Sequence, residues 1–463
     1  MKLEGAKPFA ETLEQAFGDL AHRALRLQWA TKQGLLTPDQ LNRAWRGLHD
    51  EIESIRKQLP AQEKPPHCSA KVDPREQVRR RMRKMKWPAH VTETHLHLGA
   101  ALWLGSLRAL SVLGGVRAIG PNAQEFAKSF HLDPSKIGNL AQYLNHQAEN
   151  LNTVRGSYER AELVQSGPVQ LGNSISLALD QIFSYGGCLL EQEGQDAEPI
   201  YRVNRIELRF NPLKRTAATN MTDGRIEGFY DVDKIMVAAN GAIQLGQITA
   251  ENQIQAGLIL CFGRELPHKT NMILAEKAES WRQQHPHLIG IDLAGPEAAN
   301  PLSTPESLEQ AKELFDLAGA NLGRTVHVGE STHVDIETFI KTIEALNPHR
   351  VAHPIAAYRA WADSGDDRGL KLMHEREITA ELCFISNLTT KAVPSPDFFK
   401  EMLRTFDKFE IGYTFGTDAP GLQRRTHAEE LALLLLTEAA SEEQILRSIE
   451  VGNRASFLPE KIE

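Results

Sequence analysis

The stretch "VTETHLHLGAAL" (residues 91–102) decides the fold assignment, because it joins an alternating apolar pattern to two histidines one residue apart. Side chains two residues apart on a β-strand point to the same face, so His95 and His97 would project together. Gly99 and a run of small and apolar residues follow at once. The pattern predicts a strand that ends in half of a metal site. Two histidines on a solvated strand are the simpler alternative.

Seven more β-rich runs follow, separated by longer helical stretches. Together with the first run they are "VTETHLHL" (91–98), "VNRIELRF" (203–210), "GLILCFG" (257–263), "LIGIDLAG" (288–295), "RTVHVGE" (324–330), "RVAHP" (350–354), "ITAELCFIS" (378–386) and "IGYTFGTD" (411–418). This alternation is typical of βα units. It predicts an α/β fold, a closed (β/α)₈ TIM barrel. An open doubly wound sheet is less favoured, because no glycine fingerprint follows an early strand.

Polar residues recur where these strands end. They are His95, His97, Glu207, Arg209, Arg264, Asp292, His327, Glu330, His353, Glu381 and Asp418. In such barrels the active site lies at the C-terminal ends of the strands, where residues distant in sequence converge. Any one of these residues alone is more often structural, but their agreement across these strands indicates one site.

Part of this set has the chemistry of a metal centre. Imidazole and carboxylate groups suit Zn²⁺, one per chain, or another divalent transition metal, and the predicted ligands are His95, His97, His327 and Asp418. Such a metal lowers the pKa of a bound water towards about 7. Glu330 could give a proton to the substrate, and His353 could hold and polarise the nucleophile. The set therefore predicts metal-assisted hydrolytic attack on an electrophilic carbon.

From about residue 91 to the end, the chain resembles the adenosine deaminase family of metal-dependent hydrolases. The similar segments are "THLHLGA", "RIELRFNP", "GIDLAGPE", "RTVHVGE", "RVAHP", "AELCFISN", "GTDAP" and the closing "VGNRASFLPE". The resemblance implies the same four metal ligands. It further implies that Glu330 protonates N1 of a purine, that His353 orients the hydroxide attacking C6, and that the Gly295 amide meets N3. The other zinc-deaminase signature, H-x-E with P-C-x-x-C, is absent from the sequence.

Two positions depart from the family pattern. The first motif usually reads H-x-H-x-D-G, with an aspartate that contacts the ribose, but here Gly99 directly follows Leu98. The last motif usually reads T-D-D-P, with a second aspartate that bonds purine N7, but here that residue is Ala419. A lost buried hydrogen bond costs about 1–3 kcal/mol. That loss is enough to change which substrate is used.

An arginine pair follows the last motif in "GLQRRTHAEE". Arg424 and Arg425 have the side chains of a phosphate clamp, and the missing ribose aspartate removes a repulsion against a 5′-phosphate. The pair could equally lie in solvent or contact Glu429 and Glu430 along a helix. A nucleoside and a nucleotide substrate both stay open.

The sequence favours one function over two others. The favoured function is zinc-dependent hydrolytic deamination of adenosine, deoxyadenosine or their phosphates to the hypoxanthine compound, with release of ammonia. The first alternative is a metal-dependent hydrolase of another amino-substituted ring. The second is a deaminase-like subunit with a binding or assembly role in antiviral defence.

Composition agrees with a globular enzyme. The 463 residues are 41% hydrophobic and 24% charged, and the net charge of −8 gives no general reason to expect nucleic acid or a membrane as partner. No signal peptide or membrane-spanning run is evident, and the four cysteines lie far apart. We expect a reduced, cytoplasmic protein that binds a small purine compound. A homo-oligomer stays open.

The predicted domains are a helical N-terminal extension (1–90) and the deaminase barrel (91–463). Residues 71–87 of the extension hold eight basic side chains and two acids, a local charge of +6. They predict a solvated helix face or a subunit contact, with a patch for phosphate or an acidic partner as the alternative. The long 99–202 segment and the 213–250 segment, which looks like an insertion, are candidates for a lid or an assembly surface.

Overall fold

The computed structural model describes residues 74–103, 106, 161–162, 164–189, 198–219, 226–423 and 425–460. Most of the predicted extension (1–73), most of the long 99–202 segment and Arg424 lie outside these residues.

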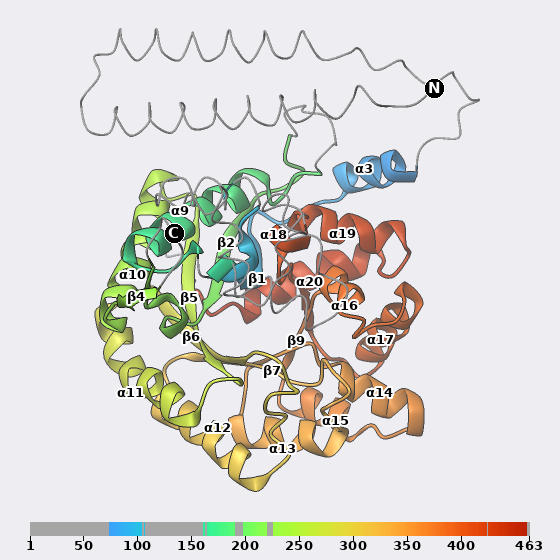
Figure 1. Cartoon of the computed structure of the whole chain (residues 1–463). Helices are drawn as coiled ribbons and strands as arrows, with labels where there is room; N and C mark the ends of the chain where they lie inside the picture. Colours follow the sequence, from blue (N-terminus) through green and yellow to red (C-terminus); the bar gives the residue numbers. More distant parts are fainter. Residues whose placement is uncertain are drawn as a thin grey trace, which may run out of the picture. The chain divides into compact units, whose positions relative to one another are not determined.

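Eight parallel strands form one sheet that curls into a barrel (Figure 1). They are, in sheet order, β1 (Val91–His97), β2 (Val203–Phe210), β5 (Gln255–Gly263), β6 (Leu288–Ala294), β7 (Gly323–His327), β8 (Arg350–Ala352), β9 (Thr379–Leu382) and β10 (Tyr413–Phe415). The barrel closes just beyond β10, where the His97 N–H donates to the Asp418 carbonyl (3.0 Å) and the Asp418 N–H donates to the His95 carbonyl (2.8 Å). All eight predicted strands are therefore confirmed, and so is the TIM barrel.

Helices lie between successive strands and surround them (Figure 1). Along the chain they are α4 (Leu98–Ala101), α9 (Pro168–Tyr185), α10 (Val232–Thr249), α11 (His268–Gln284), α12 (Pro305–Leu317), α13 (Ile336–Leu346), α14 (Ile355–Ser364), α15 (Arg368–Glu375), α16 (Phe384–Thr389), α17 (Pro396–Lys408), α18 (Pro420–Gln423), α19 (His427–Leu436) and α20 (Glu442–Ala455). The core is one cluster of apolar residues between the strands and these helices. None of the described helices is both long and apolar enough to span a membrane.

Helix α13, which joins β7 to β8, shows how local sequence sets these elements. The Asp335 side chain accepts a hydrogen bond from the Thr338 N–H (2.8 Å) and so caps the first turn. Phe339 and Ile343 lie four residues apart and are fully buried on the face that meets the barrel. The helix ends at Asn347, whose φ of 44° is left-handed, a conformation that asparagine tolerates.

The 213–250 segment is not an insertion throughout, contrary to the sequence prediction. Its second half is α10, which packs beside α9 and follows β2 as the barrel helix of that βα unit. Its first half contains a short turn, η2 (Leu213–Arg215), and a two-stranded antiparallel ribbon of β3 (Ala217–Thr219) and β4 (Ile226–Phe229). The prediction failed for α10 because its sequence, "VDKIMVAANGAIQLGQIT", is mainly apolar and has no wide polar face to mark it as a barrel helix.

Helix α3 (Pro74–Lys84) carries most of the predicted basic segment. It belongs to the same compact unit as the barrel, Asp73–Glu463, and buries Val78 and Met82 in the common core. Its arginines lie on the other side of the helix, where Arg80 pairs with Glu76 (2.9 Å). The structure thus shows a solvated helix face here, while the domain boundary at residue 90 stays a prediction.

Candidate active site

A cavity of about 160 Å³ opens at the C-terminal ends of the strands. Most of the residues predicted for the site line it, namely His97, Gly295, His327, Glu330, His353 and Asp418. His95 lies directly behind them and is fully buried. The barrel therefore brings together residues that are up to 323 positions apart in the sequence, from His95 to Asp418.

The histidines of β1 and β7 point their ring nitrogens at one place. His97 Nε2 lies 3.1 Å from His327 Nε2. His95 Nε2 is buried and has no hydrogen-bond partner among the described residues. Both His95 Nε2 and His97 Nε2 lie 3.8 Å from Asp418 Oδ1. Three imidazole nitrogens and a carboxylate oxygen thus face a common point.

Two buried carboxylates orient these rings from behind. Glu381 Oε2 lies 2.7 Å from His95 Nδ1, and Asp292 Oδ1 lies 3.1 Å from His327 Nδ1. A carboxylate that accepts the Nδ1–H of a histidine fixes the tautomer and leaves the Nε2 lone pair free to bind a cation. Both acids stand at strand ends in the sequence, where no local pattern assigns them a role.

The protonation states of His95, His97 and Asp418 suit a cation at this point. Burial lowers the pKa of His95 well below its usual range and lowers the pKa of His97 to about 3, so both rings are neutral at pH 7. Burial also opposes the charged form of His327, but the Asp292 carboxylate outweighs it and raises the pKa of that ring. For Asp418, burial is outweighed by the neighbouring histidines, which hold the pKa of its carboxyl below the usual range.

The donor set therefore fits a divalent transition metal. Several overlapping groups of three side chains have ligand atoms within 4.8 Å of one another, and they draw on His95, His97, Asp292, His327, His353 and Asp418. Asp292 is already engaged with His327 Nδ1 and with Arg209 Nη1 (3.2 Å), so it supports a ligand rather than serving as one. Neutral imidazole and ionised carboxylate are the groups that Zn²⁺ prefers.

Asp418 and His353 both adopt strained backbone conformations. Their φ angles are 57° and 55°, in the left-handed region that few non-glycine residues occupy. Each is held there by a second contact: Ser386 Oγ donates to Asp418 Oδ2 (2.6 Å), and the Asn387 amide lies 3.2 Å from His353 Nδ1. Strain of this kind is concentrated at functional sites, where the surrounding structure fixes a side chain. In this arrangement His353 Nε2 lies 4.0 Å from Asp418 Oδ2.

Glu330 lies in the loop after β7, at the edge of the cavity. Gly329, just before it, has a φ of 91°, and a Cβ there would lie 2.9 Å from the Ala356 side chain, so only glycine fits this turn. Burial raises the pKa of the Glu330 carboxyl. Thr390 Oγ1 lies 3.3 Å from its Oε1. A carboxyl group placed in this way keeps its proton more readily than a solvated one.

The loop itself is held by Glu297, a residue without a role in the sequence predictions. Its carboxylate accepts from the backbone N–H groups of Gly329 (2.6 Å), Glu330 (3.3 Å) and Ser331 (2.7 Å). It also accepts from Ser331 Oγ (2.5 Å). Glu297 is only 6% exposed, so these are charge-assisted bonds in a buried place. The segment "GIDLAGPE" contains this residue, but its partners lie in the loop after β7.

A row of buried charges lies beneath the site. Arg209 contacts both Glu381 and Asp292, while Arg350 contacts Glu381 (2.7 Å) and Glu207 (2.5 Å). All five side chains are fully buried. Each charge therefore has an opposite charge beside it, as buried ionic groups require. Glu381, which orients His95, belongs to this row, so its contacts with Arg209 and Arg350 connect the His95 ring to the charged residues of the barrel interior.

Two further buried acids lie behind the β1 histidines. Glu93 accepts from the His95 N–H (3.1 Å) and from Thr417 Oγ1 (2.7 Å), and so ties β1 to the segment before Asp418. Glu430 accepts from the Ile385 N–H (3.0 Å). Burial raises the pKa of Glu93 to about 7 and that of Glu430 to about 8. No local pattern marks either acid as buried, because Glu93 stands in an ordinary strand pattern and Glu430 in the first turn of an ordinary helix pattern.

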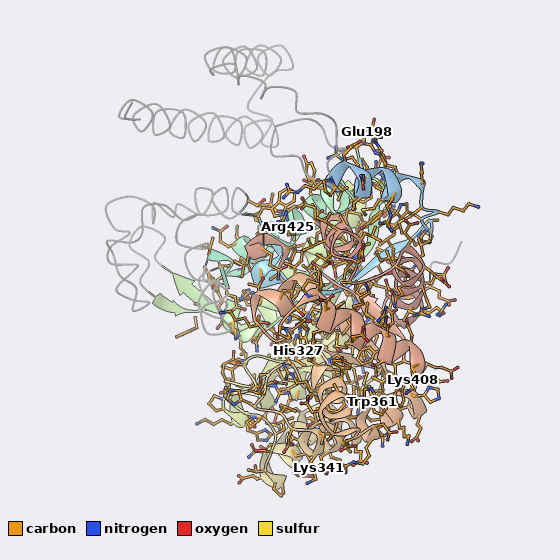
Figure 2. All side chains as sticks on the ribbon, turned by 90° about the vertical axis from the view of Figure 1, so that its right-hand side faces the viewer. Glu198, His327, Lys341, Trp361, Lys408 and Arg425 are labelled. Carbon is orange, nitrogen blue, oxygen red and sulfur yellow. The ribbon has the colours of Figure 1, made fainter. Side chains whose placement is uncertain are left out.

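Of the predicted phosphate clamp, the described residue Arg425 does not line the cavity. Arg425 is half exposed, and its Nη1 lies 3.9 Å from Glu429 Oε1. In Figure 2 the labelled Arg425 lies apart from the labelled His327. Arg424 lies outside the described residues. Contact of this pair with Glu429 and Glu430 was the alternative interpretation of the segment, and Arg425 stands just before α19, which carries Glu429.

Comparison with known proteins points to one family. The family model described as adenosine deaminase matches residues 200–463. A probable adenosine deaminase of Dictyostelium discoideum is 23% identical over 367 residues, which are 79% of this chain. The chain spans only 40% of the length of that relative.

Solved structures show the same fold. An adenine deaminase from Arthrobacter aurescens superposes with a TM-score of 0.59 at 15% identity, covering 81% of this chain and 95% of the other. An Arabidopsis N6-mAMP deaminase gives a TM-score of 0.58 at 15% identity, covering 82% and 96%. At these identities the likeness is one of fold, whereas the family model matches more than half of the chain. The chain therefore belongs to the adenosine deaminase family.

Proposed function

We propose that this protein is a zinc-dependent hydrolytic deaminase of an adenine compound. In the reaction, water adds at C6 of the ring, the bond from C6 to the amino nitrogen breaks, and ammonia leaves. One observation carries the proposal: three imidazole nitrogens and the Asp418 carboxylate face a common point in a cavity that Glu330 also lines. Family membership agrees with it.

The residues that would hold the metal are His95, His97, His327 and Asp418. When bound, the metal would supply a nucleophile from water at neutral pH. Glu381 and Asp292 keep the His95 and His327 rings in the tautomer that binding needs. The ring of His353, next to Asp418, would orient the water through Nε2, since its Nδ1 is engaged by Asn387.

Glu330 would supply the proton that the ring needs. Attack at C6 places negative charge on the adjacent ring nitrogen N1, and a protonated carboxyl beside N1 neutralises that charge. Burial raises the pKa of Glu330, which favours the protonated form before reaction. Glu297 holds the loop so that this carboxyl stays at the edge of the cavity.

The test is ammonia release by zinc-loaded protein from adenosine, deoxyadenosine, AMP, dAMP, ATP and dATP. We expect ammonia from at least one compound, and loss of that activity in Glu330→Gln with unchanged zinc content. Near-normal turnover in Glu330→Gln would remove Glu330 from the reaction. No ammonia from any compound, with zinc bound, would overturn the proposal in favour of another amino-substituted ring or a binding role.

A further inference from the structure

Helix α10 carries an apolar stripe on its outer face. Val237, Leu245 and Ile248 are 60%, 58% and 60% exposed. Gly241 lies among them, and a Cβ added there would meet no atom of another described element within 4 Å. These positions recur every three or four residues, so they share one side of the helix, while the opposite side is buried against the barrel. The outer side of a surface helix is normally polar, so this stripe needs an explanation.

Other exposed apolar side chains gather near this stripe. Val169 lies in the first turn of α9, Phe229 ends β4, and Tyr230 directly precedes the N-cap of α10. Tyr230 also approaches Gly167, just before α9, and α9 packs beside α10 (Figure 1). Six of the ten large apolar side chains that are exposed among the described residues therefore belong to α9, α10 and the strand before α10. Exposed apolar patches of this kind mark a contact with another molecule.

The stripe is complementary to itself when two copies of α10 run antiparallel. A twofold axis at the middle of the stripe, between residues 242 and 243, sets Val237 of one copy opposite Ile248 of the other. It also sets Gly241 opposite Gln244, beside Leu245. Because Gly241 has no side chain, the two helix axes can approach closely at this point. The apolar residues of one copy thus meet those of the other.

The same axis brings opposite charges together at both ends of the stripe. Lys234, in the first turn of α10, comes opposite Glu251, two residues beyond the end of the helix, and both are exposed. Each pair occurs twice, so two Lys234–Glu251 contacts flank the apolar centre. The acids at the start of the helix are used within the subunit, since Asp231 caps α10 and Asp233 forms a salt bridge to α11. A parallel pair of helices would instead set like charges against each other.

We propose that this protein forms a twofold homodimer through the outer face of α10. An isologous interface requires a surface that is complementary to itself, and the stripe is so in shape and in charge. A stable interface buries about 800 Å² on each subunit, which is more than one helix stripe supplies, so Val169, Phe229 and Tyr230 extend the contact. None of these residues lines the cavity, so each subunit keeps a complete site of its own.

The first test measures the molecular mass of the full chain by sedimentation over a range of concentrations. We expect the wild type to be a dimer and Gly241→Glu to be a monomer, with a dissociation constant raised at least about 100-fold, because two carboxylates meet at the twofold axis. The variant should fold, since there is room for its side chain and glutamate favours a helix more than glycine does. Ala362→Glu, which adds the same carboxylate at an exposed position of α14, is the matched control and should stay a dimer.

The second test exchanges the charges at the ends of the stripe. Lys234→Glu and Glu251→Lys should each raise the dissociation constant about 5- to 30-fold, because each sets two like-charged pairs against each other. The double variant should return to within about twofold of the wild type. Such a rescue identifies the antiparallel register, which a general loss of stability in the single variants would not produce.

Three results would overturn the proposal. The first is a wild type that is monomeric at about 100 µM, and binding of that monomer to lipid vesicles, lost in Gly241→Glu, would assign the stripe to a membrane surface instead. The second is a Gly241→Glu variant that remains a dimer, which would place the contact elsewhere on the chain. The third is a double charge exchange that does not restore the dimer. None of these measurements needs turnover, so they are independent of the proposed function.

Discussion

Replacement of Glu297 by glutamine tests whether this buried carboxylate positions Glu330. Each of its oxygens accepts two hydrogen bonds: Oε1 from the Gly329 and Glu330 N–H groups, and Oε2 from the N–H and the hydroxyl group of Ser331. In Glu297→Gln one oxygen becomes an NH₂ group, which donates rather than accepts. Two of the four donors then lose their partner.

The expected loss in the free energy of unfolding follows from those two lost hydrogen bonds. A hydrogen bond to a charged group contributes about 1.5–3 kcal/mol, so the upper limit of the loss is about 6 kcal/mol. Ser331 is only half-buried and can turn towards water, so we expect the free energy of unfolding to fall by about 2–3 kcal/mol. That movement displaces Glu330, and a shift of about 1 Å in a reacting group can lower kcat about 100-fold.

Urea unfolding measures the stability change, and steady-state ammonia release measures kcat and KM. The control is Asp335→Ala, which removes the N-cap of α13 in the same β7–α13 connection. It should cost about 1 kcal/mol of stability and leave kcat unchanged. A Glu297→Gln variant with the expected stability loss but a kcat within about twofold of the wild type would refute the positioning role.

Three other predictions concern single substitutions. Glu330→Gln cannot give a proton, so kcat should fall about 10²- to 10⁴-fold in ammonia-release assays with the zinc content unchanged, and a smaller fall would contradict the proton-transfer role. Burial raises the pKa of Glu430 from 4.5 to about 8, so between these pH values the folded protein keeps a proton that the unfolded chain loses. The contribution of Glu430 to the free energy of unfolding therefore declines as the pH rises from 4.5 to about 8. Glu430→Gln should therefore gain stability relative to the wild type between about pH 5 and pH 8 in urea unfolding, and an equal difference at both pH values would count against it. Arg209→Met leaves the buried Asp292 without its arginine and Glu381 with only Arg350, and it should lower the free energy of unfolding by about 3–5 kcal/mol, whereas the exposed control Arg80→Met should change it by less than about 1 kcal/mol.

The sequence predicted the barrel and the residues at its centre because both depend on local pattern. Each strand is a short apolar run of its own, and parallel strands in a barrel end at the same rim. Histidines and acids at the ends of those runs could therefore be gathered into one site without coordinates. His95, His97, His327 and Asp418 were found in this way, and the structure brings their ligand atoms together.

What the sequence missed depends on contacts between elements that are far apart along the chain. Glu297 reaches a loop more than 30 residues away, and Glu381 of β9 reaches His95 of β1 across the intervening β10. No local pattern records such a contact. The α10 segment was misassigned for a related reason, since its mainly apolar sequence becomes a barrel helix only by packing beside α9.

The residues around the cavity separate most clearly into those that local sequence predicts and those that tertiary packing places there. By itself the sequence determined the barrel and the polar residues at its rim, because strand period and strand ends are local properties. It also offered Arg424 and Arg425 as plausible neighbours of the substrate, since they follow the last metal motif. Only the tertiary structure decided that Arg425 does not line the cavity and that Glu265 and Lys214 do. The physical reason is that a side chain's direction is set by the packing of its own loop or helix turn, which proximity in sequence does not fix.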